Sequence, residues 1–128
     1  MTKRIACPPR KLQHTAIAVR LVQLPATKPG AIADYTYAII LAPDSSMAYS
    51  NRGVSRAAIA DYQGAITDYT KAIELKPNST NAYLNRASLR AKLGGNKGAI
   101  ADYKKLDSLF YSRVRKDIIK RFWNGFRN

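Results

Sequence analysis

The residues that could do chemistry in this chain are aspartates and tyrosines that recur at a fixed spacing. The sequence Gly-Ala-Ile-Ala-Asp-Tyr occupies residues 30–35, returns at 64–69 with Thr67 in place of an alanine, and appears unchanged at 98–103. Enzymatic catalysis needs a nucleophile beside a base, paired carboxylates in one pocket, or a cofactor site. None of these can be assembled from the recurring residues. We therefore predict no catalytic residue and interpret the aspartates as structural.

Two other candidate sites also have simpler interpretations. Residues 94–98, Gly-Gly-Asn-Lys-Gly, superficially look like a phosphate-binding loop, but the Gly-Lys-Ser/Thr ending is missing and no strand precedes them. We interpret them as a turn between helices. Cys7 is the only cysteine and His14 the only histidine, so the chain can form neither an internal disulfide nor a metal cage. The sequence predicts a protein that is not an enzyme, with no cofactor and no metal.

The net charge of +14 is concentrated at the two ends of the chain. Residues 1–28 contain six Lys/Arg and no acid, residues 29–103 eight bases and six acids, and residues 104–128 eight bases and two acids. Such ends attract polyanions. An alternative function is therefore a basic adaptor that associates with nucleic acid or an anionic membrane surface through its charged ends.

No run of residues reaches the roughly 18 apolar positions of a membrane-spanning helix, and no secretory signal is recognised. We expect a soluble, cytoplasmic protein. Import into an organelle stays open, because the basic start lacks acids, although it also lacks the serines typical of transit peptides.

The spacing of the recurring hexapeptide is 34 residues, and a constant period of this length indicates a repeat array. Serine or asparagine caps, helix-spaced apolar residues and breakers such as Pro77 predict helices over residues 31–41, 47–59, 62–75, 81–93 and 97–109. Gly53, inside one of these helices, is expected to let another helix approach closely. The predicted fold is all-α: a short right-handed superhelical solenoid of antiparallel helix pairs.

The period and the positions of small and aromatic residues resemble the tetratricopeptide repeat family. Residues 46–79 match that pattern through Tyr49, Gly53, Ala65, Tyr69, Ala72 and Pro77. Residues 80–111 keep Tyr83, Ala99 and Tyr103, but Leu106 and Tyr111 replace the second alanine and the proline. The resemblance implies about two full repeats, a half repeat and a C-terminal capping helix.

Arginine replaces leucine of the family pattern at residues 52 and 86, and tyrosine at residues 56 and 90. These positions normally face the partner helix, and a half-buried guanidinium needs an acceptor. Asp34, Asp68 and Asp102 recur with the same period. We therefore expect Arg–Asp pairs within or between adjacent repeats.

The chain divides into five segments: residues 1–28, a basic N-terminal arm or a degenerate capping helix; 29–45, a half repeat; 46–79 and 80–111, two repeats; and 112–128, a basic amphipathic C-terminal helix. Apolar residues recur there every four positions at Phe110, Val114, Ile118, Phe122 and Phe126. We expect this helix to cover the last repeat, and no breaker separates it from the preceding helix. The same apolar row would suit a membrane surface. With so few repeats, the chain could also be a fragment of a longer array.

The resemblance implies a concave groove lined by the first helix of each pair, which binds a peptide or a partner helix. The residues at these positions are Met47, Ser50, Asn51, Val54, Ala58, Asn81, Leu84, Asn85, Ser88 and Lys92. We predict a non-enzymatic protein–protein interaction scaffold with a protein or peptide partner and no small-molecule substrate. Asn51 and Asn85 are the main candidates, because an amide both donates to and accepts from a peptide backbone. The clamp that chaperone-binding relatives use for a C-terminal carboxylate is largely missing, since Ser50, Val54 and Asn81 replace its residues.

Overall fold

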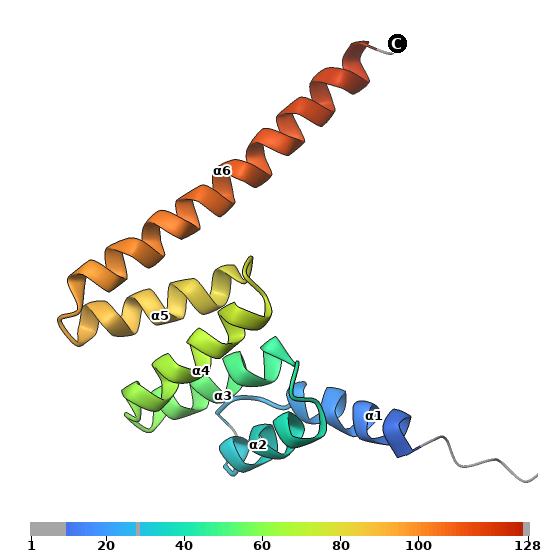
Figure 1. Cartoon of the computed structure of the whole chain (residues 1–128), viewed down its shortest axis with the longest axis vertical. Helices are drawn as coiled ribbons and strands as arrows, with labels where there is room; N and C mark the ends of the chain where they lie inside the picture. Colours follow the sequence, from blue (N-terminus) through green and yellow to red (C-terminus); the bar gives the residue numbers. More distant parts are fainter. Residues whose placement is uncertain (1–9, 28, 127–128) are drawn as a thin grey trace, which may run out of the picture.

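The computed structural model describes residues 10–27 and 29–126, and these residues form six α-helices and no strand. In chain order the helices are α1 (Arg10–Val22), α2 (Ala31–Leu41), α3 (Ser46–Ala58), α4 (Tyr62–Leu75), α5 (Thr80–Lys92) and α6 (Asn96–Phe126). Each helix packs mainly against its neighbours in the sequence, so the helices form a row that ends in the long α6 (Figure 1). The prediction of an all-α solenoid of helix pairs is confirmed.

Local residues account for where the helices begin and end. The Ser45 side chain accepts a hydrogen bond from the Ala48 amide at 3.3 Å, and the Asp61 side chain accepts one from the Gly64 amide at 3.1 Å. These contacts cap the first turns of α3 and α4. Gly94 has a φ of 82°, which glycine adopts without strain, and it lies in the predicted turn after α5.

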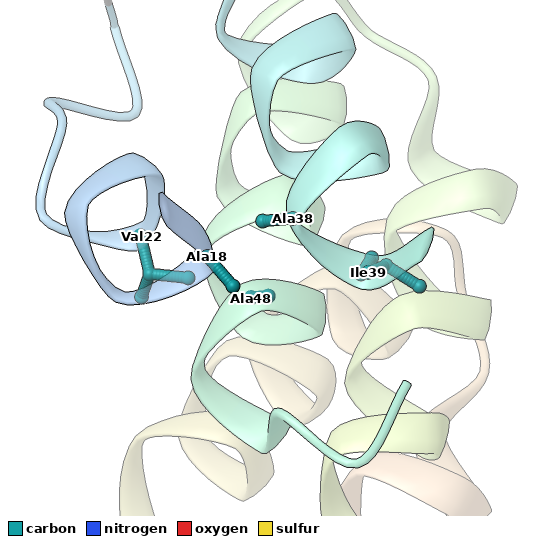
Figure 2. Packing of buried hydrophobic residues seen from close by; sticks show 5 residues of the cluster. All are labelled: Ala18, Val22, Ala38, Ile39 and Ala48. Atoms are coloured by element: carbon teal, nitrogen blue, oxygen red, sulfur yellow. The ribbon is translucent and has the colours of Figure 1, made fainter. Parts of the chain in front are cut away.

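The described part of the N-terminal segment is the helix α1. Its residues Ala18 and Val22 are buried in a cluster with Ala38 of α2 and Ala48 of α3. Figure 2 shows Ala18 pointing from α1 toward Ala48. The neighbouring Val19 is 53% exposed. The first helix therefore packs through Ala18 and Val22, with the partly buried Leu21 beside them, while Cys7 and the rest of residues 1–9 lie outside the described residues.

The recurring hexapeptide supplies part of the interior of the repeats. Ala31, Ala65 and Ala99 are buried, as are Tyr35 and Tyr69. A Cβ atom added to Gly53 would lie 2.7 Å from Cε1 of Tyr69, so the ring occupies the space that the missing side chain leaves. The expected close approach at Gly53 is confirmed.

The expected Arg–Asp pairs are present in both full repeats. Arg52 binds Asp68 through two nitrogens at 2.8 and 3.0 Å, and Arg56 binds the same carboxylate at 3.0 Å. Arg52 also donates to the hydroxyl of Thr36 at 3.2 Å, which links α3 to the preceding unit. The buried Asp68 is therefore held by two charged donors, and one of these donors ties three helices together.

The same network recurs one period later. Arg86 binds Asp102 at 2.6 and 3.0 Å and donates to Thr70 at 3.1 Å, while Arg90 binds Asp102 at 3.0 Å. Asp34 has no such pair within the described residues. One period before Arg52 and Arg56 the chain has Ala18 and Val22. The first unit thus replaces the ion pair with the apolar contacts of α1.

The C-terminal helix differs from the expected capping helix. The last 15 residues of α6, 112–126, continue the second helix of the last repeat without a break and do not fold back over it (Figure 1). Phe110, Ile118 and Phe122, which a cap would bury, are each more than 60% exposed. A turn would be needed to reverse the chain, and residues 99–124 contain no glycine or proline. No described helix is long and apolar enough to span a bilayer.

Candidate peptide-binding face

The predicted site residues lie at accessible positions on α3 and on α5, and we call this set of positions the first-helix face. On α3, Met47 and Ala58 are exposed, and Ser50, Asn51 and Val54 are half-buried. On α5, Asn81, Leu84, Ser88 and Lys92 are exposed, and Asn85 is half-buried. None of the ten is buried. The face combines aliphatic groups, such as Leu84 at 48% exposure, with amides and hydroxyls.

The two candidate asparagines have different surroundings. Nδ2 of Asn51 donates to the carbonyl oxygen of Val22, the last residue of α1, at 3.0 Å. Nearby, the hydroxyl of Ser55 donates to the Ala26 carbonyl at 2.6 Å, and that of Tyr35 donates to the Leu24 carbonyl. These bonds satisfy the carbonyls at and after the end of α1. The donor group of Asn51 therefore holds α1 in place, a role that the sequence analysis did not foresee.

Asn85 has no hydrogen bond from its side chain to any described residue. One period after Val22 the chain has Arg56, whose carbonyl already accepts the amides of Ile59 at 3.2 Å and Asp61 at 2.9 Å. In the next repeat, the carbonyl equivalent to the acceptor of Asn51 is therefore already occupied by amides of the α3–α4 turn. The half-buried Asn85 amide therefore keeps its donors and its acceptor unused within the described residues.

One end of the face carries a contact that sequence reasoning missed. Nζ of Lys92 lies 2.9 Å from the hydroxyl oxygen of Tyr62 and 4.7 Å from the centre of its ring. Tyr62 lies at the start of α4, and the residues one period away are Lys28 and Asn96, so the repeat gave no indication of it. The tyrosine fixes the Lys92 ammonium over its ring by a cation–π contact.

Two open hollows flank the first-helix face. One, of about 520 Å³, is lined by Ala58, Ile59 and Ser55 at the end of α3 and by described residues of the 26–33 segment. The other, of about 340 Å³, lies between the start of α5 and α6 and is lined by Thr80, Phe110, Arg113 and Lys116 among others. The first hollow extends the face at Ala58 with a mostly apolar wall.

A second accessible surface lies on the C-terminal half of α6, and we call it the distal face. Six of its large apolar side chains are between 49% and 69% exposed: Phe110, Tyr111, Ile118, Ile119, Phe122 and Trp123. Val114 is half-buried. Exposed apolar surface of this kind is typical of interaction sites.

The comparisons with known proteins agree with this architecture. Residues 60–94 match a family model described as TPR repeat. The Arabidopsis OM64 TPR domain has 24% sequence identity, a TM-score of 0.70, and coverage of 85% of this chain and 98% of that domain. The fold is therefore that of a tetratricopeptide repeat domain, and the resemblance seen in the sequence is confirmed.

Two further solved structures share the fold. The second TPR of Spaghetti (RPAP3), solved bound to the HSP90 peptide SRMEEVD, has 22% identity, a TM-score of 0.62, and coverage of 79% of this chain and 93% of that one. MamA has 20% identity, a TM-score of 0.69, and coverage of 82% and 61%. The search of curated proteins gave no match.

Proposed function

We propose that the chain is a non-enzymatic protein–protein interaction module that binds an extended peptide or a partner helix along the first-helix face. A solved domain of the same fold is bound to a peptide, which supports this class of function. Stacked helix pairs also offer an extended concave surface suited to such ligands. The expected cytoplasmic location stays a prediction.

The observation that carries the proposal is the unused hydrogen-bonding capacity of Asn85. Its amide can donate to a peptide carbonyl and accept from a peptide N–H, which tolerates many ligand sequences. The exposed Leu84 and Ser88 lie on the same helix and add apolar contact and a hydroxyl. The Ser88 hydroxyl already donates to the Leu84 carbonyl at 2.9 Å, so its oxygen lone pairs are its main remaining capacity.

The ligand we propose is an internal peptide segment or a helix rather than a free C-terminus. Ser50, Val54 and Asn81 stand where the carboxylate clamp of chaperone-binding relatives has other polar or basic residues. The ammonium of Lys92, held against Tyr62, favours an acidic residue at the end of the ligand that lies near α4. The HSP90 peptide of the Spaghetti domain is therefore not the ligand we expect.

The test is to select peptides from a displayed random library on the full chain and to measure their affinity by isothermal titration calorimetry. Asn85→Ala should weaken binding about fivefold to tenfold, the value of one or two hydrogen bonds. Asn124→Ala, which removes an exposed asparagine near the end of α6, is the matched control and should leave the affinity unchanged.

Asn51→Ala distinguishes the structural role of this side chain at the end of α1 from a role in peptide binding. It should lower the stability of the chain by about 1 kcal/mol, because the Val22 carbonyl loses its donor, and change peptide affinity less than Asn85→Ala does. Equal affinity of the wild-type chain and the Asn85→Ala variant for every selected peptide would contradict the proposal.

A further inference from the structure

The apolar side of α6 changes direction along the helix. In its first half, the buried Ala99 and Asp102 face α5, and the partly buried Leu106 and Leu109 pack on the same side. At about 100° per residue this line continues to Arg113, Lys116 and Lys120. The apolar residues of the distal half therefore lie mostly on the opposite side. This change of direction explains why the distal face points away from the solenoid instead of covering it.

A further repeat would pack poorly on the outer side of α6, by which we mean the side that in α2 and α4 contacts the following repeat. Thr36 and Thr70 each accept a hydrogen bond from an arginine of the following repeat, but the equivalent residue of α6 is Lys104. Ile39 and Ile73 are buried, and the equivalent residue of α6 is the exposed Asp107. Lys104 would repel an incoming arginine. Stacking of a second copy on α6 by the contacts used inside the array is therefore disfavoured.

The charge of α6 favours an anionic occupant. The helix carries eight Lys/Arg and three Asp, and Asp102 is already neutralised by Arg86 and Arg90. Both copies of a dimer formed through this helix would bring the same positive charge to the interface, which opposes self-association. A surface with many negative charges instead gains from each nearby lysine and arginine.

The width of the distal face distinguishes a lipid surface from a partner helix. At about 100° per residue, the apolar side chains from Phe110 to Trp123 cover roughly 200° of the helix circumference. A helix that packs on a protein core usually uses a stripe of about 100°. Arg115 and Arg121 lie within the apolar arc. Their long side chains can cover the arc with their stems and reach water or phosphate with their guanidinium groups.

From these observations we propose that the distal half of α6 lies on an anionic phospholipid surface. The apolar side chains enter the headgroup boundary, and Arg113, Lys116 and Lys120 remain on the polar side, where they attract the lipid charge. Trp123 lies at the end of the arc and suits the interface with its amphipathic ring. The first-helix face lies on α3 and α5, so the two proposed contacts use different helices.

The test uses the full chain and unilamellar vesicles of phosphatidylcholine, with or without phosphatidylserine. Trp123 is the only tryptophan, so its fluorescence reports on this face alone. We expect the chain to float with the vesicles that contain phosphatidylserine, with a blue shift of the Trp123 emission, and to bind vesicles of phosphatidylcholine alone at least tenfold more weakly.

Two pairs of variants separate the apolar and the charged contributions. Ile118→Glu should weaken vesicle binding about tenfold or more, whereas Ile40→Glu, at an equally exposed isoleucine on α2, should not change it. Lys116→Glu should weaken binding at least about fivefold, and the exposed Lys76→Glu should have little effect. Circular dichroism of each variant checks that the helices remain, because all four side chains are exposed.

The proposal is overturned if the wild-type chain binds neither type of vesicle. It is also overturned if vesicle binding leaves the Trp123 emission and the Ile118→Glu affinity unchanged, since the apolar face would then take no part. Parallel titrations use an acidic amphipathic helical peptide and a single-stranded oligonucleotide. A Trp123 shift with either of these and not with vesicles assigns the face to a protein or a nucleic acid and rejects the lipid surface.

Discussion

The helices α4 and α6 hold the same place in successive repeats, and their inner sides are nearly identical. Asp68 of α4 accepts arginine nitrogens at 2.8 and 3.0 Å, and Asp102 of α6 accepts them at 2.6 and 3.0 Å. Both carboxylates are almost fully buried. Each second helix is thus fixed to its own first helix by the same two arginines.

The outer sides of the two helices differ. Tyr69, whose ring packs inward against Gly53 of α3, is 2% exposed, whereas the equivalent Tyr103 of α6 is 40% exposed, so a larger part of the Tyr103 ring reaches solvent. Thr70 and Ile73 of α4 become Lys104 and Asp107 in α6. The comparison shows that the repeat motif specifies the pairing inside a unit, while a few substituted residues decide whether the outer side receives another helix or forms a surface.

The largest expected effect concerns the shared inner side. Asp68→Ala and Asp102→Ala should each lower the free energy of unfolding by about 3 kcal/mol, because two guanidinium groups lose their buried acceptor. Urea denaturation followed by circular dichroism measures this. Asp34→Ala is the control and should cost less than about 0.5 kcal/mol, since Asp34 has no ion pair within the described residues. An equal cost at all three positions would show that the arginine pairs do not set the stability.

The equivalent residues Tyr69 and Tyr103 should respond unequally to truncation. Tyr69→Ala should destabilise the chain by about 3 kcal/mol, because it leaves a cavity against Gly53. Tyr103→Ala, at a partly solvated ring, should cost about 1 kcal/mol or less. The same denaturation experiment compares the two variants. A loss at Tyr103 as large as that at Tyr69 would contradict the difference in burial between the two rings.

The smallest effect should appear at alkaline pH. Burial, with the neighbouring Asp68 carboxylate as a second cause, raises the pKa of Tyr69 from 10.0 to about 12. The unfolded chain therefore loses this proton first, so the contribution of Tyr69 to stability is intact below pH 10 and is lost as the pH rises toward 12. Denaturation midpoints measured between pH 9 and pH 12, a range that covers the rise of the pKa from 10.0 to about 12, should fall less steeply in Tyr69→Phe. Parallel pH profiles would contradict this assignment.

Much of the fold could be predicted from the sequence because similar capping, helix-breaking and packing residues recur in successive repeats. Residues 31–41 and 62–75 are helical with the predicted bounds. The helices predicted to begin at residues 47, 81 and 97 each begin one residue earlier, and their caps and breakers are local, whereas the predicted helix 112–128 is a continuation of α6. The Arg–Asp pairs were also predictable, since buried arginines and aspartates recur with one period.

The candidate site was less predictable because its differences arise outside the repeat. Asn51 and Asn85 are equivalent in sequence, but α1 offers Asn51 an acceptor that the next repeat does not offer Asn85. The contact of Tyr62 with Lys92 has no counterpart one period away. The direction of the distal face depends on the helix continuing through residue 111, whereas the family resemblance favoured a helix that covers the last repeat.

Acrylamide quenching of Trp123 in the full chain without lipid tests most directly whether the outer side of α6 is an open surface. The 64% exposure of this side chain predicts emission close to that of an indole in water and strong quenching that is unchanged after unfolding in urea. A blue-shifted Trp123 that is protected from acrylamide and becomes accessible only in urea would contradict it, because the helix would then be covered by the solenoid or by another copy.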